Sequence, residues 1–169
     1  MSLLIFVTVG SRYYPFDRLF KKLDELCESG VLKEPVFAQI GLSNYSPKYY
    51  EFVRYLSPEE FDQKIVEANI VVCHGASGSI VKALKAKKTV IGVSRLRKYK
   101  EHINDHQVQC NEAFADCHYI MMASPELDDL GECFERIYNG KANLVPWINK
   151  DPMSVINLVD QFIQENWYK

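Results

Sequence analysis

The sequence contains no long hydrophobic run. Its apolar stretches, such as LLIFVTV at residues 3–9 and IVVC at residues 70–73, are far shorter than the roughly 20 residues that cross a bilayer. Its five cysteines are scattered and never form a C-x-x-C pair, which favours reduced thiols over a disulfide scaffold. The formal net charge is only −2, so the overall charge selects neither nucleic acid nor an acidic partner. We therefore expect a cytoplasmic protein that does not bind nucleic acid.

Several common signatures of catalysis and cofactor binding are also absent. The chain has no G-x-G-x-x-G fingerprint and no Gly-Lys-Ser/Thr of a P-loop, which argues against a standard dinucleotide enzyme or NTPase. Ser77 does not stand in a G-x-S-x-G elbow. His102 and His106 stand four apart, but they lack the intervening glutamate of the metalloprotease motif. We expect no metal and no tightly bound cofactor.

What the chain does have is an alternation of strand-like and helix-like segments. Buried strands are predicted at 3–9, 36–40, 49–56, 70–73, 89–93 and 119–122. Helices are predicted at 16–27, 57–68, 104–115, 124–138 and 154–167, and a further helix follows the small residues after the strand at 70–73 and ends at about residue 87. The strands are apolar on both faces, as in a parallel sheet covered by helices on each side. We therefore predict an α/β fold with one Rossmann-like, doubly wound domain over residues 1–169, with residues 151–169 as a terminal helix.

Two serine–proline pairs are read as helix starts. Ser57-Pro58-Glu59-Glu60 has serine as N-cap, proline at the first helical position and glutamate three residues after the cap. Ser124-Pro125-Glu126 is interpreted in the same way, as the start of a helix that reaches residue 138.

Small residues gather where a helix follows the strand at 70–73, in HGASGSI at residues 74–80. Glycines there let the main chain approach a ligand, and the free N–H groups of the next helix favour a phosphate. Gly10 and Ser11 offer a similar approach after the first strand. The ligand-facing candidates are Gly10, Ser11, His74, Gly75, Ala76, Ser77, Gly78 and Ser79. The alternative is that both segments are only tight strand-to-helix turns.

Positive charge accumulates directly after this segment, because residues 82–100 hold eight lysines and arginines and no acidic residue. Such a segment suits a pyrophosphate, an anionic membrane surface or an acidic partner. The helical lysines fit a solvated face, whereas Arg95 and its neighbours lie in a loop at the expected ligand edge. Farther along, Asp105, His106 and Gln107 suit hydrogen bonding to a polyhydroxylated ligand.

The chain resembles, over nearly its whole length, the small soluble halves of split glycosyltransferases, which look like the donor-binding domain of MurG-like, GT-B type enzymes. The stretches that carry this resemblance are IFVTVGS with YPFDRL, QIGLSNY, EEFDQKIVEANIVVCHGASGSI and SRLRKYKEHINDHQVQCNEA. Bacterial exopolysaccharide and capsule enzymes look closer than the eukaryotic transferase that acts on dolichol-linked sugar.

The resemblance implies inverting transfer of a hexose or N-acetylhexosamine from a UDP-sugar to a lipid-linked acceptor. Gly10, Ser11 and residues 75–79 would surround the UDP-sugar, and residues 105–107 would face the donor sugar. The implied partner is a membrane-associated subunit that binds the acceptor and supplies the general base. His74 and His102 are weaker candidates for that base. The protein itself would lie at the cytoplasmic membrane face through this partner.

One position departs from the family pattern. Lys82 stands where the family usually has a carboxylate that grips the ribose hydroxyls, and a lysine cannot accept those hydrogen bonds. Lys82 would then reach a phosphate, or the chain is a non-catalytic, partner-binding subunit that has lost its donor. A third hypothesis, a UDP-sugar epimerase, ranks lower because such enzymes bind across two Rossmann-like halves and this chain holds one.

Overall fold

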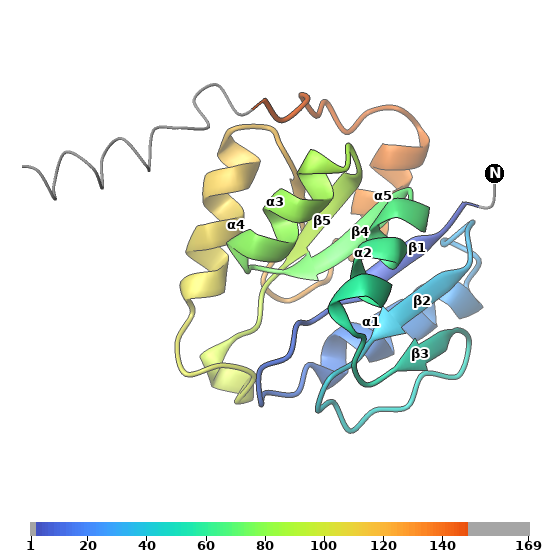
Figure 1. Ribbon diagram of the computed structural model, residues 1–169, viewed down its shortest axis with the longest axis vertical. Helices are drawn as coiled ribbons and strands as arrows, with labels where there is room; N and C mark the ends of the chain where they lie inside the picture. Colours follow the sequence, from blue (N-terminus) through green and yellow to red (C-terminus); the bar gives the residue numbers. More distant parts are fainter. Residues whose placement is uncertain (1–2, 149–169) are drawn as a thin grey trace, which may run out of the picture.

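A computed structural model describes residues 3–148, and these residues build one parallel sheet of six strands. The strand order is β3-β2-β1-β4-β5-β6 (Figure 1). The strands are β1 (Ile5–Thr8), β2 (Val36–Gln39), β3 (Glu51–Val53), β4 (Ile70–His74), β5 (Thr89–Val93) and β6 (Met121–Met122). This order, with β1 and β4 side by side in the centre, is that of a doubly wound Rossmann-like domain and confirms the predicted fold class.

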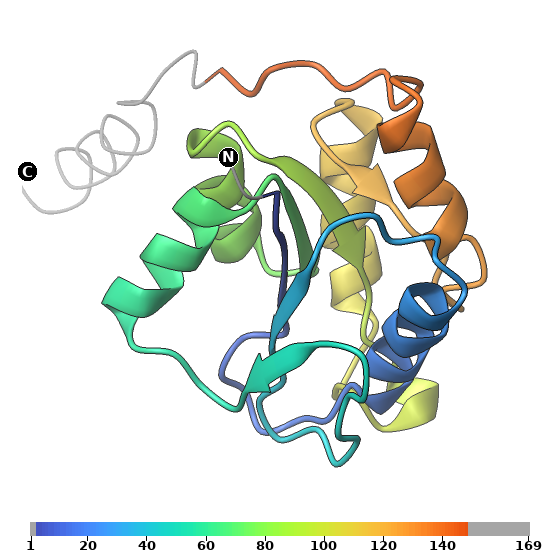
Figure 2. The same cartoon turned by 90° about the vertical axis from the view of Figure 1, so that its right-hand side faces the viewer.

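Helices cover both faces of the sheet (Figures 1 and 2). They are α1 (Asp17–Glu28), α2 (Pro58–Glu67), α3 (Ser77–Lys85), α4 (His106–Asp116) and α5 (Leu130–Tyr138), with a 3₁₀ turn, η1 (Arg97–Tyr99). Side chains of α1 and α5 join one apolar cluster, and those of α2, α3 and α4 join the other. Within β1, Ile5 and Val7 belong to the first cluster and Phe6 to the second, because successive strand residues point to opposite faces.

The first of the two predicted helix starts is confirmed. The Ser57 hydroxyl accepts a hydrogen bond from the Glu60 amide at 3.2 Å, and the Glu60 carboxylate accepts one from the Ser57 amide at 2.8 Å. This reciprocal pair satisfies two of the amides that a helix leaves free at its start, and α2 begins at Pro58 as expected.

The second predicted helix start is wrong. Residues 124–129 form a turn, and α5 begins only at Leu130. Leu127 has φ +64°, a left-handed conformation that interrupts a helix, and the Ser124 amide donates to the Asp129 carboxylate at 2.7 Å. Glu126 is drawn instead to Lys98 and the Tyr99 hydroxyl. Tertiary contacts therefore override the local capping signal.

Other boundaries differ by a few residues. The third strand covers 51–53 rather than 49–56, and α4 begins at His106 rather than at residue 104. The predicted terminal helix, 154–167 within 151–169, lies outside the described residues.

The connections that follow β1 and β4 lie on opposite faces of the sheet. The connection from β1 to β2 runs through α1 on one face, and the connection from β4 to β5 runs through α3 on the other. A crevice forms between two such strands at their carboxyl ends, which is where open α/β sheets bind ligands. The loops that follow β1, β2 and β5 gather at this edge, in the lower part of Figure 1.

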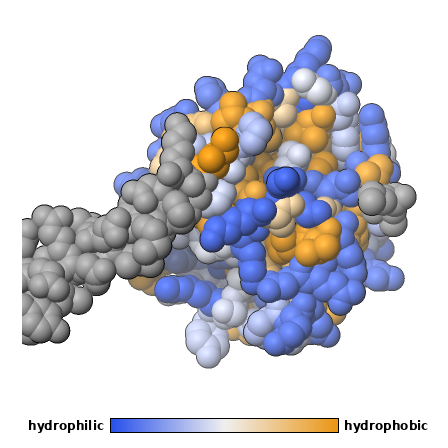
Figure 3. Space-filling view, turned by 45° about the horizontal axis from the view of Figure 1, so that its top comes forward, coloured by the Kyte–Doolittle hydropathy of each residue, from blue (hydrophilic) through white to orange (hydrophobic). Residues whose placement is uncertain are grey.

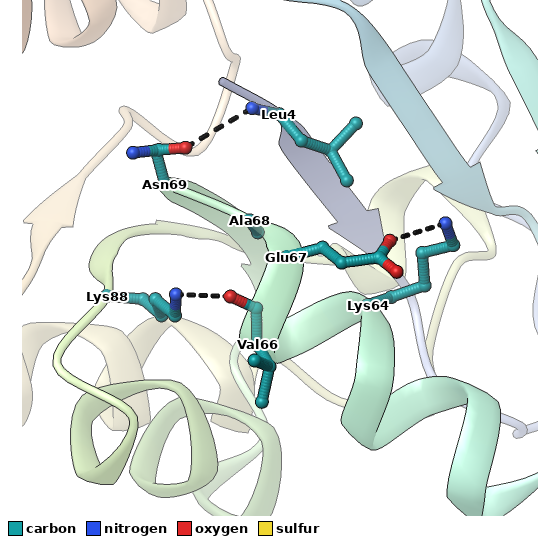
Figure 4. A pocket seen from close by; sticks show the side chains of 7 residues that line it. All are labelled: Leu4, Lys64, Val66, Glu67, Ala68, Asn69 and Lys88. Carbon is teal, nitrogen blue, oxygen red and sulfur yellow. Dashed lines mark hydrogen bonds and ion pairs between the residues drawn. The ribbon is translucent and has the colours of Figure 1, made fainter. Parts of the chain in front are cut away.

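The opposite edge, where the strands begin, holds a cavity of about 590 Å³ (Figure 4). Its polar groups already have partners: the Lys88 ammonium donates to the Val66 carbonyl at 2.6 Å, and the Lys64 ammonium pairs with Glu67 at 2.7 Å. Viewed from the side on which residues 139–148 run, hydrophilic side chains cover most of the surface and smaller apolar patches lie between them (Figure 3). Within residues 3–148, no helix is long and apolar enough to cross a membrane.

Candidate functional site

The amino end of α3 is open to an anion. Its N-cap is Ala76, which offers no side-chain hydrogen bond, and no acidic residue stands in the first turn. Ser77 and Gly78 are exposed and Ser79 is half-buried. The amides at this helix start therefore lack the internal partners that a serine or aspartate cap would supply, and the helix dipole adds positive potential there.

Gly75 brings this turn against α4. A Cβ at position 75 would lie 2.3 Å from the Gln107 carbonyl oxygen, so only glycine permits the observed approach. The Gln107 side chain is buried, and its amide oxygen accepts a hydrogen bond from the Arg95 backbone N–H at 3.0 Å. The ends of β4 and β5 and the start of α4 are thus tied together at one place.

Gly10 brings the end of β1 to the same place. Its φ is +69°, and a Cβ there would lie 2.7 Å from the His74 Cε1. The Gly10 amide donates to the Thr8 hydroxyl at 3.3 Å. Ser11, the next residue, is exposed. Both the backbone conformation and the neighbouring imidazole therefore require glycine at position 10.

His74 is a neutral, buried imidazole. Burial, reinforced by the positive charge of Arg95, lowers the pKa of His74 to about 3, against a smaller opposing effect of a hydrogen bond with the Thr8 backbone. Its Nδ1 is buried and has no hydrogen-bond partner within residues 3–148. A base with so low a pKa accepts a proton poorly at neutral pH, which disfavours His74 as the general base.

Arg95 is the largest fully buried side chain of the described residues. Its Nη2 donates to the Tyr14 carbonyl at 2.8 Å, and its guanidinium carbon lies 5.7 Å from the centre of the Phe16 ring. Its Nε and Nη1 are buried without a hydrogen-bond partner among residues 3–148. Burial lowers the pKa of Arg95 to about 10, so it keeps its charge at neutral pH. The loop after β1 covers this cation.

The polar side chains at the start of α4 and just before it are mostly exposed, and several of them contact neighbouring residues of the chain. The Asp105 carboxylate accepts a hydrogen bond from the Arg97 amide at 2.8 Å, and the His106 ring lies 3.3 Å from the Gln109 side-chain oxygen. The His102 ring instead contacts the Asn104 side-chain oxygen, 3.0 Å from Nδ1. Across residues 3–148, no three His, Cys, Asp or Glu side chains gather as metal ligands, and the expectation of no metal stays a prediction.

Lys82 is turned toward α2. Its ammonium forms an ion pair with Asp62 and lies 5.5 Å from the centre of the Phe61 ring. A groove of about 510 Å³, lined by Phe61, Gly78, Ser79, Val81, Lys82 and Lys85, adjoins the amino end of α3. The side chain at the position of the family's carboxylate thus borders the site but already has an acidic partner.

Sequence patterns did not reveal the ion pair that holds the loop after β5. The Arg18 Nε and Nη2 donate to the Glu101 carboxylate at 2.8 and 3.0 Å, and Glu101 also accepts a hydrogen bond from the Leu96 amide at 3.0 Å. Arg18 further donates to the Ser94 carbonyl at 2.7 Å. The only sequence signal was Glu101 itself, the first acid after a long basic segment.

Together, these features define a doubly wound domain in which the ends of β1, β4 and β5 meet beside the uncapped start of α3. Residues 4–145 match the family described as "Glycosyltransferase family 28 C-terminal domain". The chain belongs to this family. The match covers most of the chain and includes all the candidate residues named above. A search of curated proteins gives no match.

Solved structures agree at the level of the fold. The MurG of Acinetobacter baumannii has a TM-score of 0.59 at 17% identity and covers 98% of this chain. ALG13 has a TM-score of 0.57 at 16% identity, with 99% of this chain and 98% of that chain covered. A putative UDP-N-acetylglucosamine 2-epimerase from Listeria monocytogenes has a TM-score of 0.61 at 10% identity and covers 99% of this chain. The chain spans half or less of the length of the MurG and epimerase structures, at 50% and 46%, but nearly all of ALG13.

Proposed function

We propose that this chain is the donor-binding subunit of an inverting glycosyltransferase that uses a UDP-sugar. The observation that carries the proposal is the uncapped amino end of α3, within residues 75–79 at the switch point between β1 and β4. The family match supports glycosyl transfer as the chemistry. The UDP moiety is favoured because the same turn offers several main-chain N–H groups to a diphosphate.

The chemical role of the site is stabilisation of the departing UDP. Negative charge grows on the diphosphate as the bond to the sugar breaks, and helix-terminal amides together with a buried cation can hold that charge without a metal ion. The amides of residues 77–79 and the guanidinium of Arg95 are the groups that supply this. Asp105, His106 and Gln107 are proposed to meet the sugar.

A partner subunit is proposed to supply what this site lacks. An inverting transfer requires a base; the low pKa of His74 disfavours that residue, and the ring of His102, the other candidate, contacts the Asn104 side chain. ALG13, which this chain matches over nearly its full length, supports a donor subunit that works with a separate partner subunit. We infer a membrane-associated partner that binds a lipid-linked acceptor in polysaccharide assembly.

Calorimetric titration of the full chain with UDP, UDP-glucose, UDP-galactose and UDP-N-acetylglucosamine tests the donor site. We expect UDP to bind and Ser79→Trp to abolish binding, because the indole would fill the space before α3. Glu112→Trp, at an exposed position in the second half of α4, is the matched control and should bind as the wild type does. Binding that survives Ser79→Trp would refute the site, and no binding by any UDP compound would favour the alternative of a non-catalytic, partner-binding subunit.

The partner is tested by transfer assays. The purified chain alone should not transfer sugar to a lipid-linked acceptor, and activity should appear when the membrane-associated subunit is added. Full activity of the isolated chain would contradict the two-subunit proposal.

A further inference from the structure

Three buried polar atoms without partners lie around one loop. They are His74 Nδ1 and the Nε and Nη1 of Arg95, and residues 10–16 cover them. Leaving a buried donor or acceptor unpaired destabilises the fold, so the coincidence of three such atoms at one place is unusual for a purely structural arrangement. Arg95 also carries a positive charge, and no carboxylate of the described residues is hydrogen-bonded to it. The nearby Glu101 carboxylate accepts its hydrogen bonds from Arg18 and from the Leu96 amide.

The loop holds Arg95 by a single main-chain contact. The only hydrogen bond of the guanidinium within residues 3–148 goes to the Tyr14 carbonyl, and the Phe16 ring lies over it. A neutral carbonyl is a weaker partner for guanidinium than a phosphate oxygen, which accepts charge-assisted and often paired bonds. The loop is anchored at its end by Phe16, which is fully buried in the core and whose amide donates to the Ser43 hydroxyl at 3.0 Å. Before Phe16 it has lighter contacts, the Tyr14 amide to the Arg12 carbonyl at 2.9 Å and the Tyr14 ring 5.4 Å from that of His102.

We propose that residues 10–15 form a strap, anchored at the buried Phe16, that an anionic ligand displaces, so that Arg95 exchanges the Tyr14 carbonyl for phosphate oxygens. The ligand class is a diphosphate, and its identity as part of a UDP-sugar rests on the proposed function above. Arg95 extends from the end of β5 toward the loop after β1, and its charge acts on His74, the last residue of β4 and the one before Gly75. Displacement therefore brings a buried cation to the diphosphate only when a ligand is present.

The device explains why this cation is hidden rather than exposed. An open guanidinium in the crevice would attract any anion, whereas a covered one binds only a ligand that also engages the α3 amides firmly enough to open the strap. The neutral His74 beside it adds no second charge that would repel Arg95 from this position. Selectivity for a ligand with two phosphates follows from this two-part requirement.

The first measurement is calorimetric titration of the full chain with inorganic pyrophosphate and with UDP. We expect Arg95→Met to weaken the binding of both by about 10- to 100-fold, the value of charge-assisted hydrogen bonds. Lys141→Met removes an exposed cation just after α5, outside the candidate site, and should change either affinity by less than about 3-fold. Arg95→Lys, which keeps the charge without the fork, should fall between, and it replaces Arg95→Met if that variant does not fold.

The second measurement is amide hydrogen exchange with saturating pyrophosphate. Exchange should become faster at residues 12–15, because the strap opens, and slower at residues 77–79, because the ligand covers them. Unchanged or slower exchange at 12–15 would overturn the strap, and so would an Arg95→Met variant that binds pyrophosphate as the wild type does. Absence of pyrophosphate binding by the wild type would overturn it as well.

The two proposals fail in different ways. If UDP binds and Arg95→Met leaves its affinity unchanged, the donor site stands and the strap does not. If pyrophosphate binds through Arg95 and opens the strap but UDP binds no better than pyrophosphate, the strap stands and the nucleotide-sugar site does not.

Discussion

Replacing Gly75 by alanine tests whether the turn 75–79 is packed on α4 as tightly as the structure shows. The new Cβ would lie 2.3 Å from the Gln107 carbonyl oxygen and 2.8 Å from both Gln107 Cα and Cβ. Ordinary contacts are near 3.5 Å, so the first turn of α4 must retreat by about 1 Å. Overpacking of this kind costs about 1–3 kcal/mol, and loosening the hydrogen bond from Arg95 N–H to Gln107 adds about 1 kcal/mol.

Alanine also lowers the conformational entropy of the unfolded chain, and this raises the free energy of unfolding by about 0.4–1 kcal/mol. The net loss of unfolding free energy is therefore about 2–3 kcal/mol, or a melting temperature lowered by about 5–10 °C for a domain of this size. Calorimetry or urea unfolding measures it.

Gly78→Ala is the matched control within the same turn. Nothing lies within 4 Å of a Cβ at position 78, and the residue is helical, so alanine should stabilise the chain by about 0.5–1 kcal/mol. A Gly75→Ala variant that melts within about 1 °C of the wild type would refute the packing argument, and so would two variants of equal stability.

Three further changes have defined outcomes. Because the pKa of His74 is about 3 when folded and near 6.5 when unfolded, this residue should lower stability by up to about 1.4 kcal/mol per unit as pH drops from 6.5 toward 3. His74→Gln should make the slope shallower and leave the part due to Glu60, Glu67 and Glu126, whose pKa values are also lowered; an unchanged slope in pH-dependent urea unfolding would contradict this. Glu101→Gln leaves the Arg18 guanidinium without its carboxylate and should lower the free energy of unfolding by about 2 kcal/mol. A change below about 0.5 kcal/mol would show that the ion pair does not stabilise the fold. Lys82→Glu sets a carboxylate beside Asp62 near the anion site, so UDP affinity in calorimetry should drop about 5-fold. A higher affinity would instead mean that Lys82 impairs donor binding in the wild-type chain.

The regular parts of the fold were predictable because local and tertiary preferences agree there. The apolar run at residues 3–9 becomes β1, and the capping residues of Ser57 and Glu60 act as expected because both are exposed and free to bond each other. At Ser124 the same local signal failed, since Glu126 gains two partners, Lys98 and Tyr99, from a loop that is distant in sequence. No local pattern contains that information.

The sequence could predict which backbone segments form the candidate site, but not the burial and charge states of its side chains. The small residues of 75–79 could be located from the sequence, because glycine and serine after a buried strand directly suggest close main-chain approach. The states of Arg95 and His74 depend on what covers them. A basic segment is usually solvated, and only the loop from β1, some 80 positions away in sequence, buries Arg95. Sequence proximity gave no sign of that cover.

The most direct test of the donor site is amide NMR of the full chain as UDP is added. If UDP occupies the proposed donor site, the largest shift changes fall on Gly10, Ser11 and residues 75–79, with smaller changes at residues 105–107. The contradicting result is saturable binding whose shifts cluster instead at the opposite edge of the sheet, around the cavity of Leu4, Asn69 and Lys88.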